Sequence, residues 1–346
     1  MDTRTKKRAV AILRALRDAG RPLGASRLAR DLEAMGIDMS QRTVRYYLAM
    51  LDGEGLTRSC GKKGREITPL GEEEVAHAFV AEKVGFISAK VDQLTCQMTF
   101  QPRRRTGTII LNLSTVPADR IREAAREITA VFDAGLGMGR HLAVARPGEA
   151  IGKFKTPADC FAIGTVCSVT LNGLLLGEGI PTTSRFGGLL EISNGEPVRF
   201  TEMIEYSGSS LDPLEIFISG RMTTVREAAR TGNGIVGAGF REVPAVAVPR
   251  IRRLQAKLER LGLAGIVAIG KPNRPLLEVP VPEGRAGLIV IGGLNPLAAV
   301  YEAGIDTHNK ALTGLVDFAE LVEYTDLRAR VGALPLTAGA EGVRTA

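Results

Sequence analysis

Three side chains at the start of one predicted helix have the chemistry to read nucleotide bases. Gln41, Arg42 and Arg45 follow Ser40, whose hydroxyl can accept a backbone N–H of the first helical turn and so begin a helix. Apolar residues at helical spacing occupy the opposite side of this segment: Val44, Leu48 and Leu51. The amide and guanidinium groups are therefore left exposed at the N-terminal half of the helix, which is the half that contacts base edges in helix-turn-helix proteins.

A basic tip follows, in the segment Gly61-Lys62-Lys63-Gly64 between two short strand-like runs. Ammonium and guanidinium groups at this tip would contact phosphate or the minor groove, which sets affinity and salt dependence more than the choice of sequence. The expected DNA-contacting residues are Ser40, Gln41, Arg42, Thr43, Arg45, Tyr46, Lys62, Lys63 and Arg65.

Two earlier helices complete the domain that would position these groups. The first has apolar residues at i, i+3, i+4 and i+7 between positions 9 and 16, and it stops at Gly20. The second ends at Gly36 and has its apolar face at Leu28, Leu32 and Met35. Three short helices followed by two strands predict a winged helix over residues 1–69, although a small helical domain that only packs or dimerises would show the same helices.

The distribution of charge decides between these two interpretations. Residues 1–67 contain 15 Lys+Arg and 8 Asp+Glu, and this excess equals the net charge of +7 of the whole 346-residue chain. The remainder of the chain is therefore neutral. A neutral body with one basic module is typical of nucleic-acid-binding proteins.

Composition excludes several other classes of protein. The chain has no run of about 18 apolar residues that would span a membrane, and its N-terminus lacks the apolar stretch of a secretion signal. Four cysteines and three histidines are scattered without the spacing of a zinc site. We therefore expect a cytoplasmic protein with reduced thiols, no metal and no membrane partner.

Downstream, the chain is predicted to be an internally duplicated α/β or α+β unit. Three short segments recur in order: Phe200-Thr-Glu-Met-Ile-Glu-Tyr206 with Phe318-Ala-Glu-Leu-Val-Glu-Tyr324, Leu171-Asn172-Gly173 with Leu294-Asn295-Pro296, and Gly179-Ile180 with Gly304-Ile305. We expect a linker helix over residues 70–84, an effector-binding domain over 85–333 and a flexible tail over 334–346. The effector-binding domain would have two lobes, 85–220 and 221–333, related by a pseudo-twofold axis.

Three polar segments of this domain could hold a small anion. Residues 164–173 alternate polar and apolar side chains as a strand would, which places Ser168, Thr170 and Asn172 on one face. Arg185 lies in a segment expected to be flexible, and Arg241 lies near a third glycine-containing segment. Arginines with hydroxyl donors suit a dicarboxylate, although each residue alone could equally be a strand-edge or turn residue satisfied within the protein. The expected effector-binding residues are Cys167, Ser168, Thr170, Asn172, Arg185 and Arg241.

Signatures of catalysis are missing from the sequence. It has no phosphate-binding Gly-x-x-x-x-Gly-Lys-Ser/Thr, no Gly-x-Ser-x-Gly and no His-Glu-x-x-His. Gly135-Leu-Gly-Met-Gly139 follows a predicted helix rather than a strand, so it is interpreted as a helix C-cap and not as a dinucleotide turn. We therefore expect a protein that is not an enzyme.

Together these segments resemble the NrpR family of nitrogen-regulatory repressors. The resemblance runs over nearly the whole chain and is carried by Gly64-Arg-Glu-Ile-Thr-Pro-Leu-Gly71, residues 164–176, residues 200–206 and 211–217, Gly239-Phe-Arg-Glu-Val-Pro244 and Gly292-Gly-Leu-Asn-Pro-Leu297. It implies a homodimer that binds double-stranded operator DNA near nitrogen-assimilation genes, with the basal transcription machinery as a further partner. It also implies release of the DNA by 2-oxoglutarate, a regulatory ligand rather than a cofactor.

Two alternatives from other classes stay open. The same module occurs in RNA-associated proteins, for which a preference for structured RNA over duplex DNA would be the sign. A metabolic enzyme with a regulatory DNA-binding head would instead turn over a bound keto acid.

Overall fold

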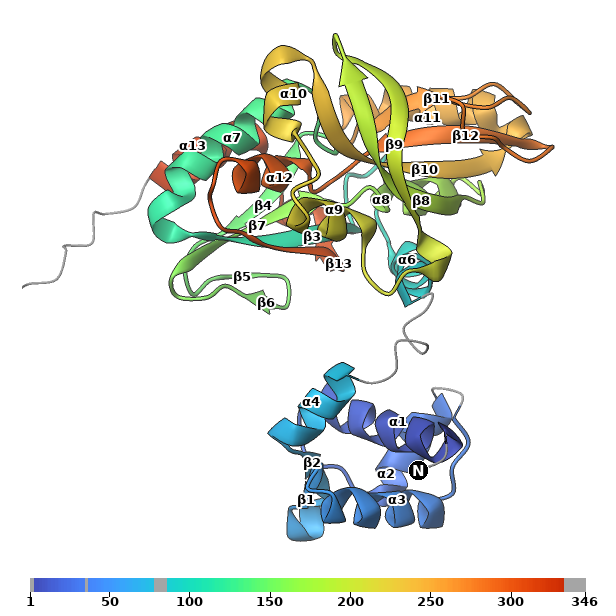
Figure 1. Cartoon of the computed structure of the whole chain (residues 1–346), viewed down its shortest axis with the longest axis vertical. Coiled ribbons are helices and arrows are strands. Elements are labelled where there is room, and N and C mark those ends of the chain that lie inside the picture. The colour runs from blue at the N-terminus through green and yellow to red at the C-terminus, as the bar shows by residue number, and fades with distance from the viewer. Residues whose placement is uncertain (1–2, 35–36, 78–85, 333–346) are drawn as a thin grey trace, which may run out of the picture. The chain divides into compact units, whose positions relative to one another are not determined.

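The computed structural model describes residues 3–34, 37–77 and 86–332, and the chain divides into two compact units, Met1–Lys83 and Val84–Ala346. Each unit is considered by itself (Figure 1). Residues 78–84 of the predicted linker and the predicted tail over 334–346 lie outside the described residues. None of the described helices has the length and apolar character needed to cross a membrane.

The smaller unit is the predicted winged helix. Its elements are α1 (Thr3–Ala19), α2 (Ala25–Ala34), α3 (Gln41–Gly53), β1 (Thr57–Ser59), the 3-10 turn η1 (Gly61–Lys63), β2 (Arg65–Ile67) and α4 (Pro69–His77). The predicted stop at Gly20 is confirmed, because that residue has φ of +60°. The predicted apolar faces of the first three helices form one buried core, which includes Ile12, Leu28 and Leu48. Met35 and Gly36, predicted at the end of the second helix, lie outside the described residues.

Helix α4 occupies the first half of the segment predicted as a linker. Its Val75 is 3% exposed and packs in the same core as the residues of α1 to α3. The described part of the linker prediction is therefore a helix of the winged-helix unit.

The larger unit contains two five-stranded antiparallel sheets (Figure 1). The first has the order β11-β12-β10-β8-β9, which are Ile266–Ile269, Arg285–Ile291, Gly234–Pro244, Thr183–Ser193 and Glu196–Glu205. The second has the order β13-β3-β7-β4-β14, which are His308–Asp317, Thr108–Pro117, Cys160–Val166, His141–Ala145 and Val322–Glu323. A small hairpin is formed by β5 (Ala150–Ile151) and β6 (Phe154–Lys155).

The helices of this unit are α6 (Phe86–Gln97), α7 (Ile121–Asp133), α8 (Thr170–Gly177), α9 (Pro213–Ser219), α10 (Val225–Thr231), α11 (Val248–Arg260), α12 (Asn295–Glu302) and α13 (Leu327–Gly332). Short 3-10 turns are η2 (Ala118–Arg120), η3 (Tyr206–Gly208), η4 (Ala245–Ala247), η5 (Phe318–Glu320) and η6 (Tyr324–Asp326). One face of the second sheet is covered by α7, α12 and α13, since Val116 and Ile163 cluster with Ile128, Leu297 and Leu327.

The predicted duplication is confirmed, and the two copies exchange strands. The series β3-α7-β4-β7-α8-β8 is followed by the matching series β10-α11-β11-β12-α12-β13. The last strand of each series pairs with the first strand of the other, β8 with β10 and β13 with β3. The expected lobes, 85–220 and 221–333, are therefore not separate sheets, because each sheet takes strands from both.

Two local predictions in the duplicated region were wrong. The strand predicted over residues 164–173 ends at Val166 and is followed by α8 from Thr170, because Leu171, Leu174 and Leu175 are buried at helical spacing. The segment around Arg185, predicted to be flexible, lies in strand β8.

The match of Asn172 with Asn295 is also corrected. Helices α8 and α12 begin at Thr170 and Asn295, an offset of 125 residues, so Thr170 is the structural equivalent of Asn295. The two side chains form equivalent hydrogen bonds. The Thr170 hydroxyl accepts from the backbone N–H of Ile110 and donates to its C=O, and the Asn295 side-chain amide does the same with Gly237.

Candidate nucleic-acid interface and buried arginine site

The start of α3 is fixed by the predicted cap. The Ser40 hydroxyl accepts the Thr43 backbone N–H at 3.1 Å and lies 2.9 Å from the Thr43 hydroxyl. The Gln41 amide donates to the Ser26 hydroxyl of α2. Ser40 and Thr43 therefore fix the start of α3, and Gln41 joins it to α2, which positions the residues that follow.

Arg42, Arg45 and Tyr46 project from this capped end. All three are exposed, Tyr46 at 68%, and neither guanidinium forms an ion pair with another described residue. Val44 and Leu48, on the other side of the same helix, are fully buried, which confirms the predicted apolar stripe. Two cationic forks thus remain available to an external partner.

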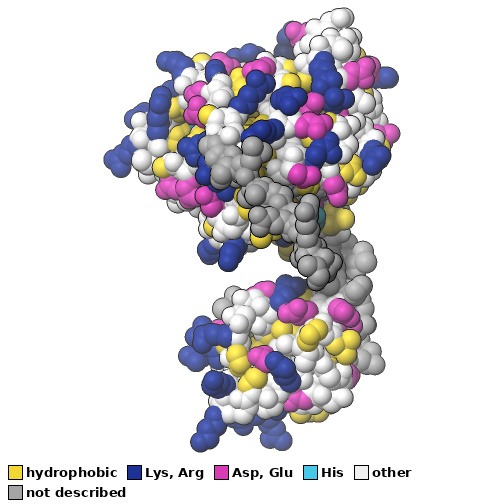
Figure 2. Space-filling model, turned by 90° about the vertical axis from the view of Figure 1, so that its left-hand side faces the viewer, with side chains coloured by type: hydrophobic (Ala, Val, Ile, Leu, Met, Phe, Trp, Pro, Cys, Tyr) yellow, Lys and Arg dark blue, Asp and Glu magenta, His cyan; other side chains and the backbone are white. Residues whose placement is uncertain are grey.

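The wing presents Lys62 and Lys63 but not Arg65. Both lysines are exposed in η1, whereas the Arg65 Nε lies 2.6 Å from Oδ2 of Asp52 on α3. The same residue bonds Leu23 through its backbone N–H and C=O. Arg65 therefore braces the wing against the helices. Figure 2 shows Lys and Arg side chains at the end of this unit that carries α3 and the wing.

In the larger unit, three of the residues expected to bind the effector meet at one buried point. Arg241 of β10 is 0% exposed, and it donates from Nε to Asn172 Oδ1 at 3.1 Å and from Nη2 to Ser168 Oγ at 3.2 Å. The Asn172 amide in turn donates to Ser184 Oγ at 2.9 Å. The ring of Tyr206 lies 5.7 Å from the guanidinium carbon.

This guanidinium is buried among neutral acceptors. Its third hydrogen bond goes to the Phe240 carbonyl at 3.4 Å, and no carboxylate oxygen of the described residues lies within 4.0 Å of its nitrogens. No described carboxylate contacts this charge directly, and the buried Asp212 acts on it only from a longer distance. Burying such a charge costs several kcal/mol after relaxation of the protein, so the arrangement favours a site that receives an anion.

The other three expected residues form no hydrogen bond with this guanidinium. Thr170 is committed to the Ile110 backbone, and burial raises the pKa of the Cys167 thiol to about 12, so it stays protonated. Arg185 pairs through Nη1 with Glu242 Oε1 at 2.7 Å. Because Glu242 follows Arg241 on β10, the Glu242 side chain lies on the opposite face of the sheet from Arg241, and Arg185 lies there with it.

Asp212 is a buried group that the sequence analysis missed. It is 7% exposed and caps α9, accepting the Leu214 backbone N–H at 2.9 Å. Burial, helped by the nearby Glu215, raises its pKa to about 6, and the positive charge of Arg241 opposes the shift. The Asp-Pro-Leu-Glu sequence, with an acceptor before a proline, was the available signal for this cap.

Asp212→Asn is expected to stabilise the protein at pH 7.5 by on the order of 1–2 kcal/mol, because asparagine caps helices as well as aspartate does and carries no charge. The folded-state pKa is raised, so the stability linked to Asp212 is full below pH 4 and is lost as pH rises through about 6. Urea unfolding at pH 4 and pH 7.5 measures this; a gain in the free energy of unfolding that is equal at both pH values would contradict it.

No described group of three or more His, Cys, Asp or Glu residues is placed to hold a metal ion.

Two family models match the chain. The model described as "NrpR regulatory domains NRD1 and 2" matches residues 84–323, and the one described as "Ribonuclease R winged-helix domain" matches residues 10–75.

Relatives were found in methanogens. The global nitrogen regulator NrpRI of Methanosarcina mazei is 32% identical over 323 residues, which is 93% of this chain and 99% of the relative. Global nitrogen regulators NrpR of Methanococcus maripaludis and Methanocaldococcus jannaschii are 29% and 30% identical over 91% and 86% of this chain. The chain spans only 55% and 51% of the length of these two.

A solved structure supports the same assignment. The crystal structure of a nitrogen repressor-like protein from Methanococcus jannaschii matches with a TM-score of 0.58 and 30% identity, covering 68% of this chain and 97% of the other. With a regulatory-domain model that matches 84–323 and a relative 32% identical over almost its full length, this chain belongs to the NrpR family.

Proposed function

We propose that this protein is a transcriptional repressor of nitrogen-assimilation genes that binds duplex operator DNA through its winged helix. The observation that carries the proposal is the two exposed guanidinium groups of Arg42 and Arg45, which pair with no carboxylate of the described residues. They lie at the capped end of α3, beside a wing with exposed Lys62 and Lys63. The relatives are named global nitrogen regulators, and this supports nitrogen-assimilation genes as the genes that are regulated. A cytoplasmic homodimer would set two α3 helices about one DNA turn apart on a palindromic site.

The proposed effector is 2-oxoglutarate or a closely similar dicarboxylate, bound by Arg241 with Ser168 and Asn172. The support is physical: a guanidinium with only neutral acceptors gains a counter-charge when a carboxylate arrives, and the contact can be bidentate. Because Arg241 is 0% exposed, the carboxylate can reach it only after the elements that cover it move apart. The ligand would then favour an opened state over the closed one, which is the differential binding that regulation requires.

The test is fluorescence-anisotropy binding of the full-length protein to duplexes selected from a random library, followed by titration with 2-oxoglutarate. Release of the DNA at millimolar ligand, with succinate inactive, is the expected result. DNA binding that ignores 2-oxoglutarate would leave the winged helix in place and overturn the effector assignment.

Two further arms of this experiment address the rival classes. Structured RNA competes poorly with duplex DNA if the proposal is right, and a preference for RNA would favour the RNA-associated alternative raised by the ribonuclease-type winged-helix match. Recovery of unchanged 2-oxoglutarate after prolonged incubation is expected, whereas turnover would identify an enzyme.

A further inference from the structure

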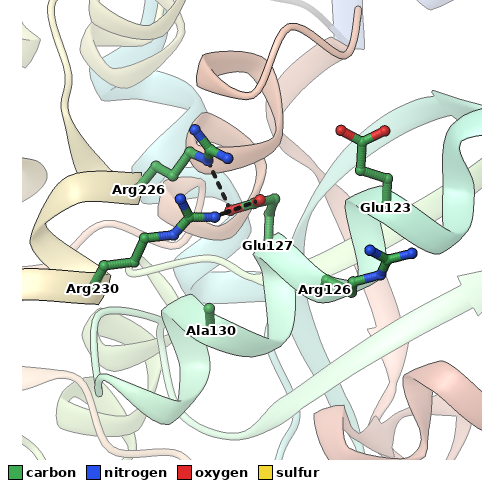
Figure 3. Close-up of a pocket in the computed structure, with 6 residues that line it drawn as sticks. All are labelled: Glu123, Arg126, Glu127, Ala130, Arg226 and Arg230. Atoms are coloured by element: carbon green, nitrogen blue, oxygen red, sulfur yellow. Dashed lines mark hydrogen bonds and ion pairs between the residues drawn. The ribbon is translucent and has the colours of Figure 1, made fainter.

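A cavity of about 380 Å³ lies between α7 and α10 (Figure 3), and Arg241 is not among its lining residues. Its lining residues are Glu123, Arg126, Glu127, Ala130, Arg226 and Arg230. Three of these six side chains are arginines. They come from two helices that are about 100 residues apart in the sequence, and Glu127 of α7 forms ion pairs with Arg226 and Arg230 of α10.

Two of the arginines converge on one buried carboxylate. Glu127 is 7% exposed and accepts from Arg226 Nε at 3.1 Å and from Arg230 Nη2 at 2.9 and 3.1 Å (Figure 3). Two positive charges on one negative charge leave one positive charge without a partner. Both arginines stay partly exposed, at 39% and 50% of the side chain, so they can also contact a molecule in the cavity.

The remaining charges of the lining add to this excess. Glu123 is already paired with Arg120, whose Nη2 lies 2.8 Å from its Oε2. Arg126 is exposed and forms no ion pair with another described residue. The lining therefore carries an uncompensated positive charge from Arg126 as well as the excess at Glu127.

Surrounding contacts hold the site in place. Glu302 of α12 accepts the Thr223 hydroxyl at 2.7 Å and the backbone N–H groups of Val225 and Arg226 at 3.0 and 2.8 Å. These bonds fix the start of α10 and hence the position of Arg226. A second cavity of about 350 Å³ shares Arg226 and Arg230 and extends to Glu302. The guanidinium groups are thus carried by two helices, α7 and α10, and Glu302 of α12 fixes the start of α10.

We propose that the cavity between α7 and α10 is a second anion site, which takes a small oxoanion carrying two or more negative charges. A guanidinium group can donate two hydrogen bonds to one carboxylate or phosphate group. Glu127 already accepts hydrogen bonds from Arg226 and Arg230, and an oxygen of the ligand would accept from the same two groups. The ligand source is either a di- or tricarboxylate or a phosphate compound, since both present this chemistry. This site is independent of the proposed effector contact at Arg241.

Isothermal titration calorimetry of the full-length protein tests the site with four probes: inorganic phosphate, pyrophosphate, citrate and 2-oxoglutarate. Binding of pyrophosphate but not citrate would identify a phosphate ligand, and the reverse a carboxylate ligand; binding of none would overturn the proposal. Arg230→Gln is expected to weaken the binding of the active probe about tenfold, the value of one charge-assisted contact.

Glu127→Gln gives a result of opposite sign. The amide keeps an acceptor for the arginines but removes the competing negative charge, so binding of the probe should strengthen severalfold. Arg122→Gln is the matched control, because this exposed arginine lies on the same helix but does not line the cavity. Equal losses in Arg122→Gln and Arg230→Gln would show only general attraction by surface charge, and weaker binding in a folded Glu127→Gln protein would also overturn the site.

Discussion

Arg42→Ala is expected to lower the affinity for the selected operator by roughly 10- to 100-fold while leaving the affinity for random duplex DNA within about threefold of wild type. The guanidinium projects from the capped, N-terminal end of α3 and is not held by an ion pair with a described residue. An arginine that bonds a guanine edge in two places supplies about 1–3 kcal/mol of discrimination between bases.

Lys62→Ala is the matched substitution in the wing, and a different pattern is expected. An ammonium group that contacts phosphate adds affinity for every sequence, so its loss should weaken selected and random duplexes by the same factor. The slope of log K against log salt should also fall by about one unit. Arg17→Ala, which removes an exposed arginine of α1 that is paired with Asp18, serves as the control for net charge.

Anisotropy titrations of both duplexes at several salt concentrations separate these outcomes. An equal loss of sequence preference in Arg42→Ala and Lys62→Ala would show that the division of roles between α3 and the wing is wrong. An unchanged preference in both variants would move base reading to other residues, of which Arg45 is the nearest.

The winged helix was predictable because its signals are local. The cap at Ser40, the stripe of Val44 and Leu48, and the stop at Gly20 act within a turn or two of helix, and the structure has all of them. Arg65 is the exception within this domain. Its ion pair with Asp52 joins residues 13 apart across the domain, and charge alone could not distinguish a brace from a phosphate contact.

The body was predictable as a duplication but not as a topology. Gly179 and Gly304 mark equivalent turns, since their φ values of +70° and +77° favour glycine at both places. The exchange of β8 and β13 between the copies leaves no local trace, because each strand alternates in the same way whichever neighbour it pairs with. The pairing of Glu127 with Arg226 and Arg230 was missed for the same reason.

Residues 164–173 show where periodicity fails over a short span. Alternation through Val166 is a true strand pattern, but it runs into the first residues of α8 without a glycine or proline to mark the boundary. The polar face predicted for this segment was geometrically wrong, and yet Ser168 and Asn172 do meet. The turn and the first helical turn direct both toward Arg241.

Arg241→Met is expected to abolish release of the DNA by the effector, raising the concentration needed by 100-fold or more, while the protein stays folded. The guanidinium makes hydrogen bonds to Asn172, Ser168 and the Phe240 carbonyl, each worth about 1.5–3 kcal/mol at a charged group. Against this stands the cost of burying a charge that no described carboxylate contacts directly, which is several kcal/mol. The two quantities are of similar size, but the substitution leaves the acceptors of Asn172 and Ser168 without their donor, so the free energy of unfolding should fall by about 1–3 kcal/mol.

Thr170→Val is the matched comparison, because it should lose a similar amount of stability and keep the effector response. Its hydroxyl satisfies the backbone N–H of Ile110, so an isosteric valine leaves a buried donor unpaired and should cost about 1–3 kcal/mol. The effector response should not change, because Thr170 does not contact Arg241. Urea unfolding and effector-titrated anisotropy on both variants give four measurements. If Arg241→Met unfolds the protein while the remaining folded fraction still responds, the buried charge serves the fold and the effector binds elsewhere. If it stays folded and no longer responds while Thr170→Val still does, Arg241 binds the effector.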